Sequence, residues 1–442
     1  MKVFYPIIQV IFFLLVTSSF AQQRDTLSLE EIIRVGLNNN YSIQVAKMES
    51  EIAANNVTRG NAGFLPIVNV SAARNFNSNN VEGLLQNGNE LNLVWARSDN
   101  YNMAVNMNWT IFDGFRMFTT YERLRALSGL GEVNARVQIE NTVTQIVLAY
   151  YNLLVEQERL AVLQNNLEIS EERMKIAKSK YEVGSGSKLE YLTSQVDYNS
   201  DRTGLIRQQE LMNVTRTILN QLILFDLTEV YAVSPNILID DDLALENLIE
   251  SLKSANAAII AARQNIYIAD LAVKELQSER MPSVGVNAGF SYSGNNNPAG
   301  FLVTSQTEGY TYGISASWNV FNGLNLNRNI QNAKINAQIA KARSNELEVN
   351  QEAELRIAYL RYVNNLSLLE MEKENVTIAM ESAEIALERY KLGVSTPIEL
   401  REAQRTTTAA LIRKLDVEFV AKLAELEIYR LSGNLIGKYS LQ

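Results

Sequence analysis

Histidine and cysteine are both absent from this chain of 442 residues, so its chemistry rests on carboxylates, hydroxyls, amides and amines. Without those two residue types there is no disulfide, no cysteine nucleophile, no Ser-His-Asp triad and no His/Cys zinc site. A pair of carboxylates, as in glycosidases, is one arrangement for acid–base catalysis that this composition still allows. Glu190 and Glu399 occupy equivalent places in the two halves of the chain, so a hydrolase stays open as an alternative, although the sequence points to no concave site around them.

Two other motifs point to no chemistry. Residues 433–438 resemble a phosphate-binding loop, but they have one residue too few between the glycines, lack Ser or Thr after Lys438, and follow a helical pattern. The acidic residues 240–242 indicate a linker or a cap between the two halves. We therefore predict no metal site and no cofactor. The formal net charge of −9 also disfavours nucleic acid as a partner.

The first 21 residues have the pattern of a secretory signal peptide. Lys2 supplies a positive charge, an apolar run covers residues 10–16, and residues 19–21 form a small-x-small cleavage site. A transmembrane anchor is the alternative, but the apolar run is too short to cross about 30 Å of hydrocarbon. No cysteine follows the cut, which excludes an N-terminal lipid on cysteine. No later run approaches the ~20 apolar residues of a spanning helix, so we expect an exported protein that is soluble or inserted as strands.

The sequence is internally duplicated. Two pairs of matched blocks lie 209 residues apart, namely 108–114 with 317–323 and 180–184 with 389–393. Upstream, Pro66 and Pro282 are matched at an offset of 216 residues. The change of offset places a seven-residue insertion or deletion between each proline and the next matched block. Such changes collect in loops, so we predict a loop there.

Long stretches without glycine or proline predict very long helices in each copy. Residues 131–184 and 323–393 are rich in Glu, Leu, Ala, Gln and Lys between their bounding glycines. Apolar positions shared by the two copies fit a 3.5-residue repeat, which is typical of packing in a left-handed supercoil. A helix over about 113–183 would be about 100 Å long at about 1.5 Å per residue. A second apolar stripe follows each glycine turn, so each copy contains a long antiparallel helical hairpin.

Before each of these long helices the period of the apolar residues changes to two, which indicates strands. Residues 101–111 and 310–320 alternate apolar with polar side chains, and so do the residues after Pro66 and Pro282. Each run has about 10 to 13 residues, the length of a tilted transmembrane strand. The polar faces are small and uncharged, which suits a solvated lumen better than a packed core. The joining segments are rich in Asn, Gly and Ser and are predicted to be exposed loops, at about 77–100 and 294–308.

Four strands per chain are too few to close a barrel. A sheet edge exposed to lipid would leave backbone N–H and C=O groups unpaired, at several kcal/mol each. Two chains would give about eight strands with an interior filled by side chains, and three would give about twelve with room for a channel. The polar face of Asn, Ser and Gly favours the wider barrel. The sequence therefore predicts a homotrimer whose strands contact membrane lipid.

The order of these elements, written twice behind a signal peptide, resembles the TolC family of outer-membrane efflux and secretion channels. The resemblance covers the mature chain from about Leu27 to about Gly433. Three pairs of motifs carry it: Phe64-Leu65-Pro66 and Met281-Pro282, Trp109-x-x-Phe112-x-Gly114 and Trp318-x-x-Phe321-x-Gly323, and Lys180-Tyr181-x-x-Gly184 and Arg389-Tyr390-x-x-Gly393. Each motif is weakly specific, and their joint order is strongly specific.

The resemblance implies a mainly α-helical fold with a transmembrane β part. Three chains would form a 12-stranded β-barrel in the outer membrane, continued by an α-barrel across the periplasm. The closed tip would dock onto a periplasmic adaptor (membrane fusion) protein that serves an inner-membrane transporter, and the channel would be a passive exit duct rather than an enzyme. The alternative is an exported periplasmic coiled-coil scaffold without a channel. Drugs, metal cations, peptides and proteins all stay open as substrates.

The resemblance also implies roles for individual residues. Glu399 and Glu402, at i and i+3 on one helix face, match an acidic pair at the channel constriction, with Glu190 as the counterpart of Glu399. The alternative to a role at the constriction is that the two glutamates lie on a solvated helix face, where Arg401 could pair with them. The tips expected to dock onto an adaptor are Tyr181, Val183, Gly184 and Ser187 in the first copy and Tyr390, Leu392, Gly393 and Thr396 in the second. The aromatics expected at the membrane interface are Trp109, Trp318, Tyr310 and Tyr312.

These predictions divide the chain into a signal peptide and two structural repeats. The signal peptide is residues 1–21. The first repeat, 22–232, is expected to hold strands at about 64–75 and 100–111 and a helical hairpin at 113–225. The second, 233–442, is expected to hold strands at about 282–293 and 309–320 and a helical hairpin at 322–432.

Overall fold

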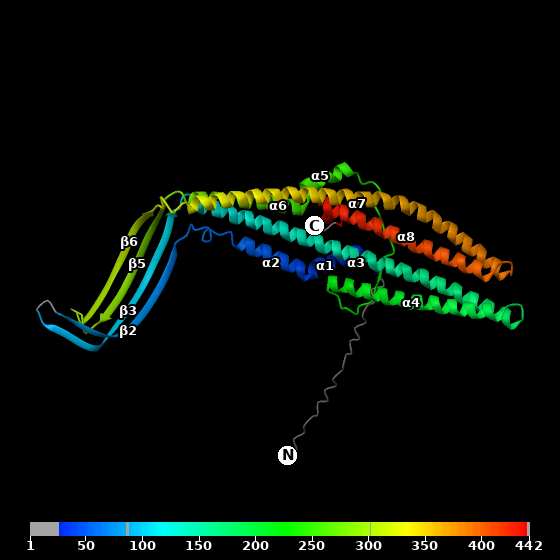
Figure 1. Cartoon of the computed structure of the whole chain (residues 1–442), viewed down its shortest axis with the longest axis horizontal. Helices are drawn as coiled ribbons and strands as arrows, with labels where there is room; N and C mark the ends of the chain where they lie inside the picture. Colours follow the sequence, from blue (N-terminus) through cyan, green and yellow to red (C-terminus); the bar gives the residue numbers. More distant parts are fainter. Residues whose placement is uncertain (1–25, 85–87, 301, 440–442) are drawn as a thin grey trace, which may run out of the picture. The chain divides into compact units, whose positions relative to one another are not determined.

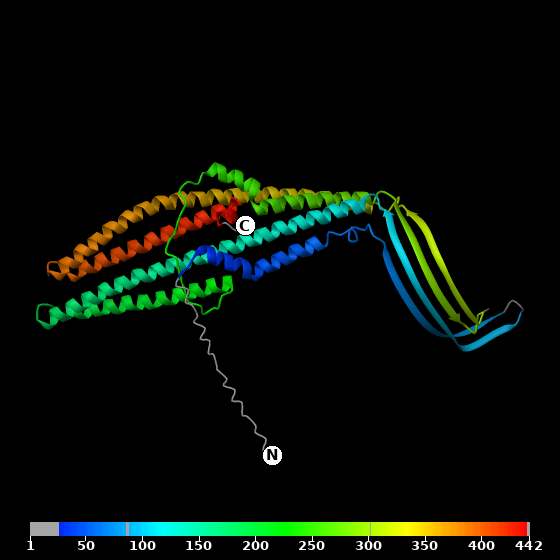
Figure 2. The same ribbon diagram turned by 180° about the vertical axis from the view of Figure 1, so that it is seen from behind.

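The computed structural model describes residues 26–84, 88–300 and 302–439, so the predicted signal peptide lies outside the described residues. Each half of the chain has two short helices, two strands and two long helices (Figures 1 and 2). The first half contains α1 (Leu29–Asn39), α2 (Tyr41–Asn55), β2 (Ile67–Leu84), β3 (Glu90–Phe112), α3 (Arg116–Glu182) and α4 (Lys188–Ile223). The second contains α5 (Leu245–Ala255), α6 (Ala257–Ser278), β5 (Ser283–Asn296), β6 (Thr304–Ser317), α7 (Asn325–Lys391) and α8 (Pro397–Leu431). Three short elements complete the fold: β1 (Thr26–Leu27), β4 (Ala232–Val233) and α9 (Leu435–Lys438).

The chain forms two compact units, and each of them takes segments from both halves. Unit 1 comprises the described part of Met1–Gly36 together with Ile146–Ile237 and Asn375–Leu415. Unit 2 comprises Leu37–Gln145 without residues 85–87, Leu238–Glu374 without residue 301, and the described part of Asp416–Gln442. The 67-residue helices α3 and α7 contribute to both units. The duplicated halves are therefore interleaved rather than packed as two separate domains.

The core of unit 2 gathers apolar faces from α5, α6, α7 and α8. Its fully covered side chains include Leu252, Ile259, Leu355 and Ile428. Asn256 stands at the junction of α5 and α6, where its side-chain oxygen accepts from the N–H of Ile259 at 3.0 Å. An N-cap of this kind satisfies one of the orphan N–H groups of the helix. In the first half Asn40 caps α2 in the same way, 216 residues earlier.

The predicted linker around residues 240–242 is held down by a cluster of polar contacts in unit 2. Lys422 is buried on α8, where its Nζ donates to the carbonyl of Leu238 at 2.6 Å and lies 3.0 Å from a carboxylate oxygen of Glu425. The hydroxyl of Tyr362 donates to the backbone carbonyl of Asp240, whose carboxylate pairs with Lys438. Burial raises the pKa of Glu425 and lowers that of Lys422, because both charged forms are removed from water. The acidic linker is thus a strap fixed to α7, α8 and α9.

The contact of Tyr362 with this strap should make the free energy of unfolding depend on pH in the alkaline range. Burial, together with the nearby charge of Glu425, raises the pKa of Tyr362 to about 12, from its ordinary value of 10. A raised pKa in the folded state means that the stabilisation is present below pH 10 and is lost as pH rises towards 12. We expect the free energy of unfolding to fall more steeply between pH 10 and 12 in the unaltered protein than in Tyr362→Phe. Parallel denaturant titrations in detergent would measure this, and identical slopes would contradict the assignment.

The strands run farther than the alternation predicted. The first hairpin keeps an antiparallel ladder through pairs such as Asn75 with Asn100 and Asn77 with Ser98, so the prediction of a loop over 77–100 is wrong for most of its length. The ladder likewise occupies 294–296 and 304–308. Low strand propensity in Asn, Ser and Gly is overridden by the continuous backbone hydrogen bonding of the paired strands. The seven-residue difference between the copies makes the first hairpin longer than the second.

The helices of the described segments have no stretch that is both long and apolar enough to cross a membrane.

Candidate functional site

The four long strands form one antiparallel sheet in the order β2-β3-β5-β6 (Figure 1). Directly paired residues in antiparallel strands point to the same face. The register brings the apolar residues of all four strands into common rows on one face. Three such rows are Val70-Val105-Phe290-Tyr310, Val68-Met107-Ala288-Tyr312 and Trp109-Val286-Ile314. The period of two in the sequence therefore becomes a continuous apolar surface.

The opposite face of the sheet is polar and carries small side chains. Its rows are Asn69-Asn106-Gly289-Thr311, Ser71-Ala104-Ser291-Gly309 and Ile67-Asn108-Asn287-Gly313, and within these three rows only Ile67 is large and apolar. Within the described chain the apolar face has no covering layer, since Val70, Tyr310 and Tyr312 are 77%, 81% and 88% exposed. A contiguous apolar surface of this kind marks contact with a membrane or with another protein.

Both predicted interface tryptophans lie where the sheet meets the helices. Trp109 is in β3, whereas Trp318 follows directly after β6, which ends at Ser317. Each indole N–H donates to a backbone carbonyl just before the matched proline: Trp109 to Phe64 at 2.9 Å, and Trp318 to Arg280 at 3.0 Å. The two tryptophans therefore close equivalent turns in the two halves, a role that the sequence alone did not show. Tyr310 and Tyr312 lie within β6 on the apolar face.

The two hairpin turns have the same backbone geometry. Gly184 and Gly393 adopt φ of +78° and +77°, and each donates its N–H to the carbonyl three residues earlier at 3.1 Å. The next residues, Ser185 and Val394, donate to the carbonyls five residues earlier at 2.9 and 3.0 Å. These two bonds define a Schellman motif, which ends a helix on a left-handed residue. Ser187 and Thr396 then cap the returning helices, with hydroxyls that accept from the N–H of Glu190 at 3.1 Å and of Glu399 at 3.2 Å.

Apolar side chains at the tips are strongly exposed, but the two tyrosines of the tip motif differ. Val183 and Leu392 are 78% and 77% exposed. Tyr181 is exposed and stacks on Tyr191, with ring centroids 6.3 Å apart. Tyr390 is fully buried: the Nζ of Lys180 lies 4.2 Å from its ring centroid, and burial raises the pKa of its hydroxyl well above its ordinary value. The second tip is thus anchored, through Tyr390, to the first.

Alanine at the tip glycines isolates the backbone cost of the turn. A Cβ at Gly184 or Gly393 would meet nothing within 4 Å, so only the left-handed conformation is strained. We expect Gly393→Ala to weaken the turn locally by about 1–2 kcal/mol. Hydrogen exchange of the amides around 389–396 should become faster by a corresponding factor. The control is Gly204→Ala within α4, which has the same open surroundings without a positive φ and should be neutral or stabilising. Equal effects at both positions would contradict the assignment.

The three predicted constriction carboxylates have different surroundings within the chain. Glu190 accepts a hydrogen bond from the hydroxyl of Tyr390 at 2.9 Å. Glu399 accepts from Ser395 Oγ at 2.6 Å, which holds the pKa of this exposed carboxyl below its ordinary value. Glu402 is exposed on the next turn of α8. Glu399 and Glu402 therefore have accessible carboxylates one helical turn apart. The Glu190 carboxylate instead accepts its hydrogen bond from Tyr390 of the second hairpin.

A charge network that the sequence analysis missed ties α8 and α3 to α4. Arg401 reaches Asp201 with two nitrogens at 2.7 and 3.0 Å, and so differs from the alternative in which it pairs with Glu399 and Glu402. Arg173, whose side chain is 2% exposed, lies 2.5 Å from Asp197. The spacing of Asp197 and Asp201, at i and i+4 on one helix face, was the available signal. These residues are not repeated in the other half, so the search for duplicated motifs passed over them.

Comparisons with known proteins agree with this geometry. The family model described as "Outer membrane efflux protein" matches residues 32–223 and 248–434. Nodulation protein T of Rhizobium leguminosarum bv. trifolii is 24% identical over 431 residues, covering 93% of this chain and 87% of that protein.

Solved structures show the same fold. The CmeC outer membrane channel of Campylobacter jejuni superposes with a TM-score of 0.77 at 16% identity, over 92% of this chain and 86% of that one. The outer membrane protein VceC of Vibrio cholerae superposes with a TM-score of 0.75 at 17% identity, over 92% and 96%. The predicted fold class, the outer-membrane location and the resemblance to efflux channels are confirmed. This chain is a member of the outer membrane efflux protein family.

Proposed function

We propose that the protein is the outer-membrane exit duct of a tripartite efflux or type I secretion system, built as a homotrimer. The observation that carries this proposal is the four-stranded sheet, with one apolar face and, in the described chain, β2 and β6 as its outer strands. Each outer strand leaves a row of backbone N–H and C=O groups without a ladder partner. In lipid these groups must be paired, so the sheet requires other strands to close it.

Three copies satisfy that requirement and leave a passage. Twelve strands of this kind would form a barrel whose apolar rows face lipid and whose Asn, Ser and Gly rows face water. The aromatic side chains of Trp109, Trp318, Tyr310 and Tyr312 would lie against the lipid. The chain would be a passive conduit, because the family and its structural neighbours are channels and transport energy would come from an inner-membrane transporter.

The hairpin tips are the proposed contact with a periplasmic adaptor. Each Schellman turn carries an exposed apolar side chain, Val183 or Leu392, and is followed by a polar cap, Ser187 or Thr396. Exposed apolar side chains on a rigid turn are suited to bind an apolar pocket of a partner. Glu399 and Glu402 are the proposed lining of a constriction, where three copies would form rings of carboxylates that favour cations. The Glu190 carboxylate is hydrogen-bonded to the Tyr390 hydroxyl, so its proposed role is to support the constriction rather than to line it.

Purified protein in detergent tests the proposal directly. Native mass spectrometry should give three times the mass of the mature chain, and the same preparation should produce stepwise conductance in a planar bilayer. A protein that stays monomeric in plain buffer and gives no conductance would contradict the proposal and support the periplasmic scaffold instead.

A further inference from the structure

We infer that the contact between the two halves of one chain is the template for the contact between neighbouring chains, down to the strand register. This inference rests on the proposed oligomer and adds to it the residues that meet. The first half contacts the second within the chain, through β3 with β5 and α3 with α6. In a closed ring of such chains the second half of one copy meets the first half of the next, and the duplication maps this contact onto the equivalent elements, β6 with β2 and α7 with α2.

The internal duplication supplies the register. β6 lies 209 residues after β3, and β2 lies 216 residues before β5. The observed pair Asn106 with Gly289 therefore maps onto Ser315 with Ala73 of the next copy. The observed pair Asn108 with Asn287 maps onto Ser317 with Ser71, and Met103 with Tyr292 maps onto Tyr312 with Phe76.

The mapped register keeps the two faces of the sheet intact across the junction. Ser315 and Ala73 both lie on the polar face, and Tyr312 and Phe76 both lie on the apolar face. A shift by one residue would place apolar side chains against the polar face along the whole strand. The same offsets are given by two pairs of residues outside these strands, Gly184 with Gly393 and Pro66 with Pro282, so the agreement between faces does not depend on matches within the strands.

The helices give a second mapped contact. Within the chain, Gln264 of α6 donates its side-chain N–H to the carbonyl of Ala126 on α3 at 3.0 Å. The equivalent residues are Met48 on α2 and Ile335 on α7, which are 58% and 52% exposed in the described chain. An apolar pair thus takes the place of a polar contact. Contact between Met48 of one copy and Ile335 of the next would bury the exposed surface of both side chains.

Two more contacts between α3 and α6 map onto compatible residues. Arg123 pairs with Glu275 at 2.9 Å, and the residues at the matched positions are Asn332 on α7 and Arg59 in the turn after α2, both exposed and able to hydrogen-bond. Tyr267 donates to Glu122, and the equivalents Glu51 and Gln331 are also exposed and complementary. None of the mapped pairs brings like charges together.

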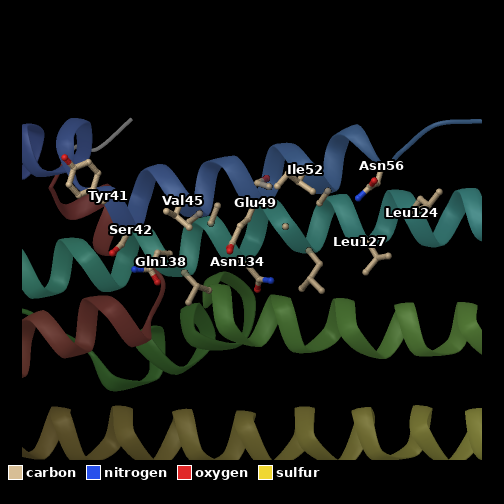
Figure 3. A pocket seen from close by; sticks show the side chains of 17 residues that line it. Tyr41, Ser42, Val45, Glu49, Ile52, Asn56, Leu124, Leu127, Asn134 and Gln138 are labelled. Carbon is tan, nitrogen blue, oxygen red and sulfur yellow. The ribbon is translucent and has the colours of Figure 1, made fainter. Parts of the chain in front are cut away.

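The surface of α2 shows where the next copy would lie. α2 and α3 enclose an open groove of about 870 Å³, into which Val45 and Ile52 of α2 and Leu127 of α3 point (Figure 3). Val45, Met48 and Ile52 are 52%, 58% and 61% exposed and form one stripe at helical spacing. The occupant that fits this stripe is α7 of a second copy, whose exposed Ile335 and Ile339 have the same spacing.

Cysteine pairs can test the register without background, because the chain contains no cysteine. Four double variants combine Ser71→Cys or Ala73→Cys with Ser315→Cys or Ser317→Cys. Directly opposed residues have Cα atoms about 4.5–5.5 Å apart, within disulfide range, whereas a displacement by two residues moves them to about 7–8 Å. On oxidation in native membranes, the matched pairs 73 with 315 and 71 with 317 should give ladders of linked dimers and trimers. The mismatched pairs 71 with 315 and 73 with 317 should give at least about fivefold less.

A helix pair keeps the test decisive if the strand variants fail to reach the membrane. Met48→Cys with Ile335→Cys, treated with a short bismaleimide, should link neighbouring chains. Met48→Cys with Leu360→Cys should not, because Leu360 lies 25 residues farther along α7, about 37 Å away. Trimers whose mismatched pairs link as well as the matched ones, or whose matched pairs fail to link, would overturn the inference and leave the trimer proposal intact. Absence of any trimer would overturn both.

Discussion

Gly433→Ala is expected to destabilise the protein by about 2–5 kcal/mol. Gly433 follows α8 with φ +73°, and a Cβ there would lie 2.5 Å from the backbone carbon and oxygen of Ala255. The backbone at Ala255 cannot move freely, because Arg136 donates to its carbonyl and Asn256 donates to the carbonyl of Leu431 at 2.8 Å. Left-handed strain and overpacking therefore act together. The measurement is the midpoint of thermal unfolding in detergent, followed by circular dichroism.

Gly437→Ala is the matched control for this prediction. Gly437 lies four residues later in α9, has no positive φ, and would place its Cβ in open space. We expect its midpoint to equal or slightly exceed that of the unaltered protein. The account of this junction fails if Gly433→Ala unfolds at the same temperature as the control.

Asp197→Ala is expected to cost about 3–5 kcal/mol of local stability at the junction of α3 and α4, because it leaves a buried guanidinium without its counter-ion. Arg173 is the group concerned, with only 2% of its side chain exposed and Asp197 at 2.5 Å. The double variant Arg173→Met with Asp197→Ala removes both charges and should recover most of the loss. Hydrogen exchange across residues 165–205 would measure the local effect.

A surface ion pair on α3, the helix that carries Arg173, is the control for Asp197→Ala. Lys175 lies 2.6 Å from Glu171, and their side chains are 68% and 42% exposed. Solvent screens such a pair, so Glu171→Ala should change stability by less than about 1 kcal/mol. An effect of Asp197→Ala as small as that of Glu171→Ala would show that the Arg173 network does not hold the helices together.

The parts of the fold that repeat with a fixed spacing could be predicted from the sequence. The glycine turns at Gly184 and Gly393, the alternation in β3 and β6, and the runs of helix formers between glycines all follow from local rules that act twice. Chance agreement is small when both copies obey the same rule at the same offset. The order of elements and the family followed from these features.

The remaining features depend on contacts that local rules do not contain. The indole N–H of Trp109 donates a hydrogen bond to a backbone carbonyl 45 residues away. Every residue has a backbone carbonyl, so the sequence does not indicate which one is the acceptor. Tyr181 and Tyr390 share one motif, yet only Tyr390 is buried, because Lys180 of the other hairpin packs on its ring. Arg401 points to Asp201, 200 residues away, rather than to the glutamates beside it. The two copies differ in the contacts of Tyr390 and Arg401, whereas the tryptophan contact is present in both.

The central claim is that one face of the sheet contacts lipid and the other lines a water-filled passage. Single cysteines at each of residues 310–315 in β6, reconstituted in vesicles, test it most directly. A charged maleimide should label positions 311, 313 and 315 quickly, and a quencher carried on lipid acyl chains should quench a fluorophore at 310, 312 and 314. Uniform labelling along the strand, or quenching at 311, 313 and 315, would contradict the account.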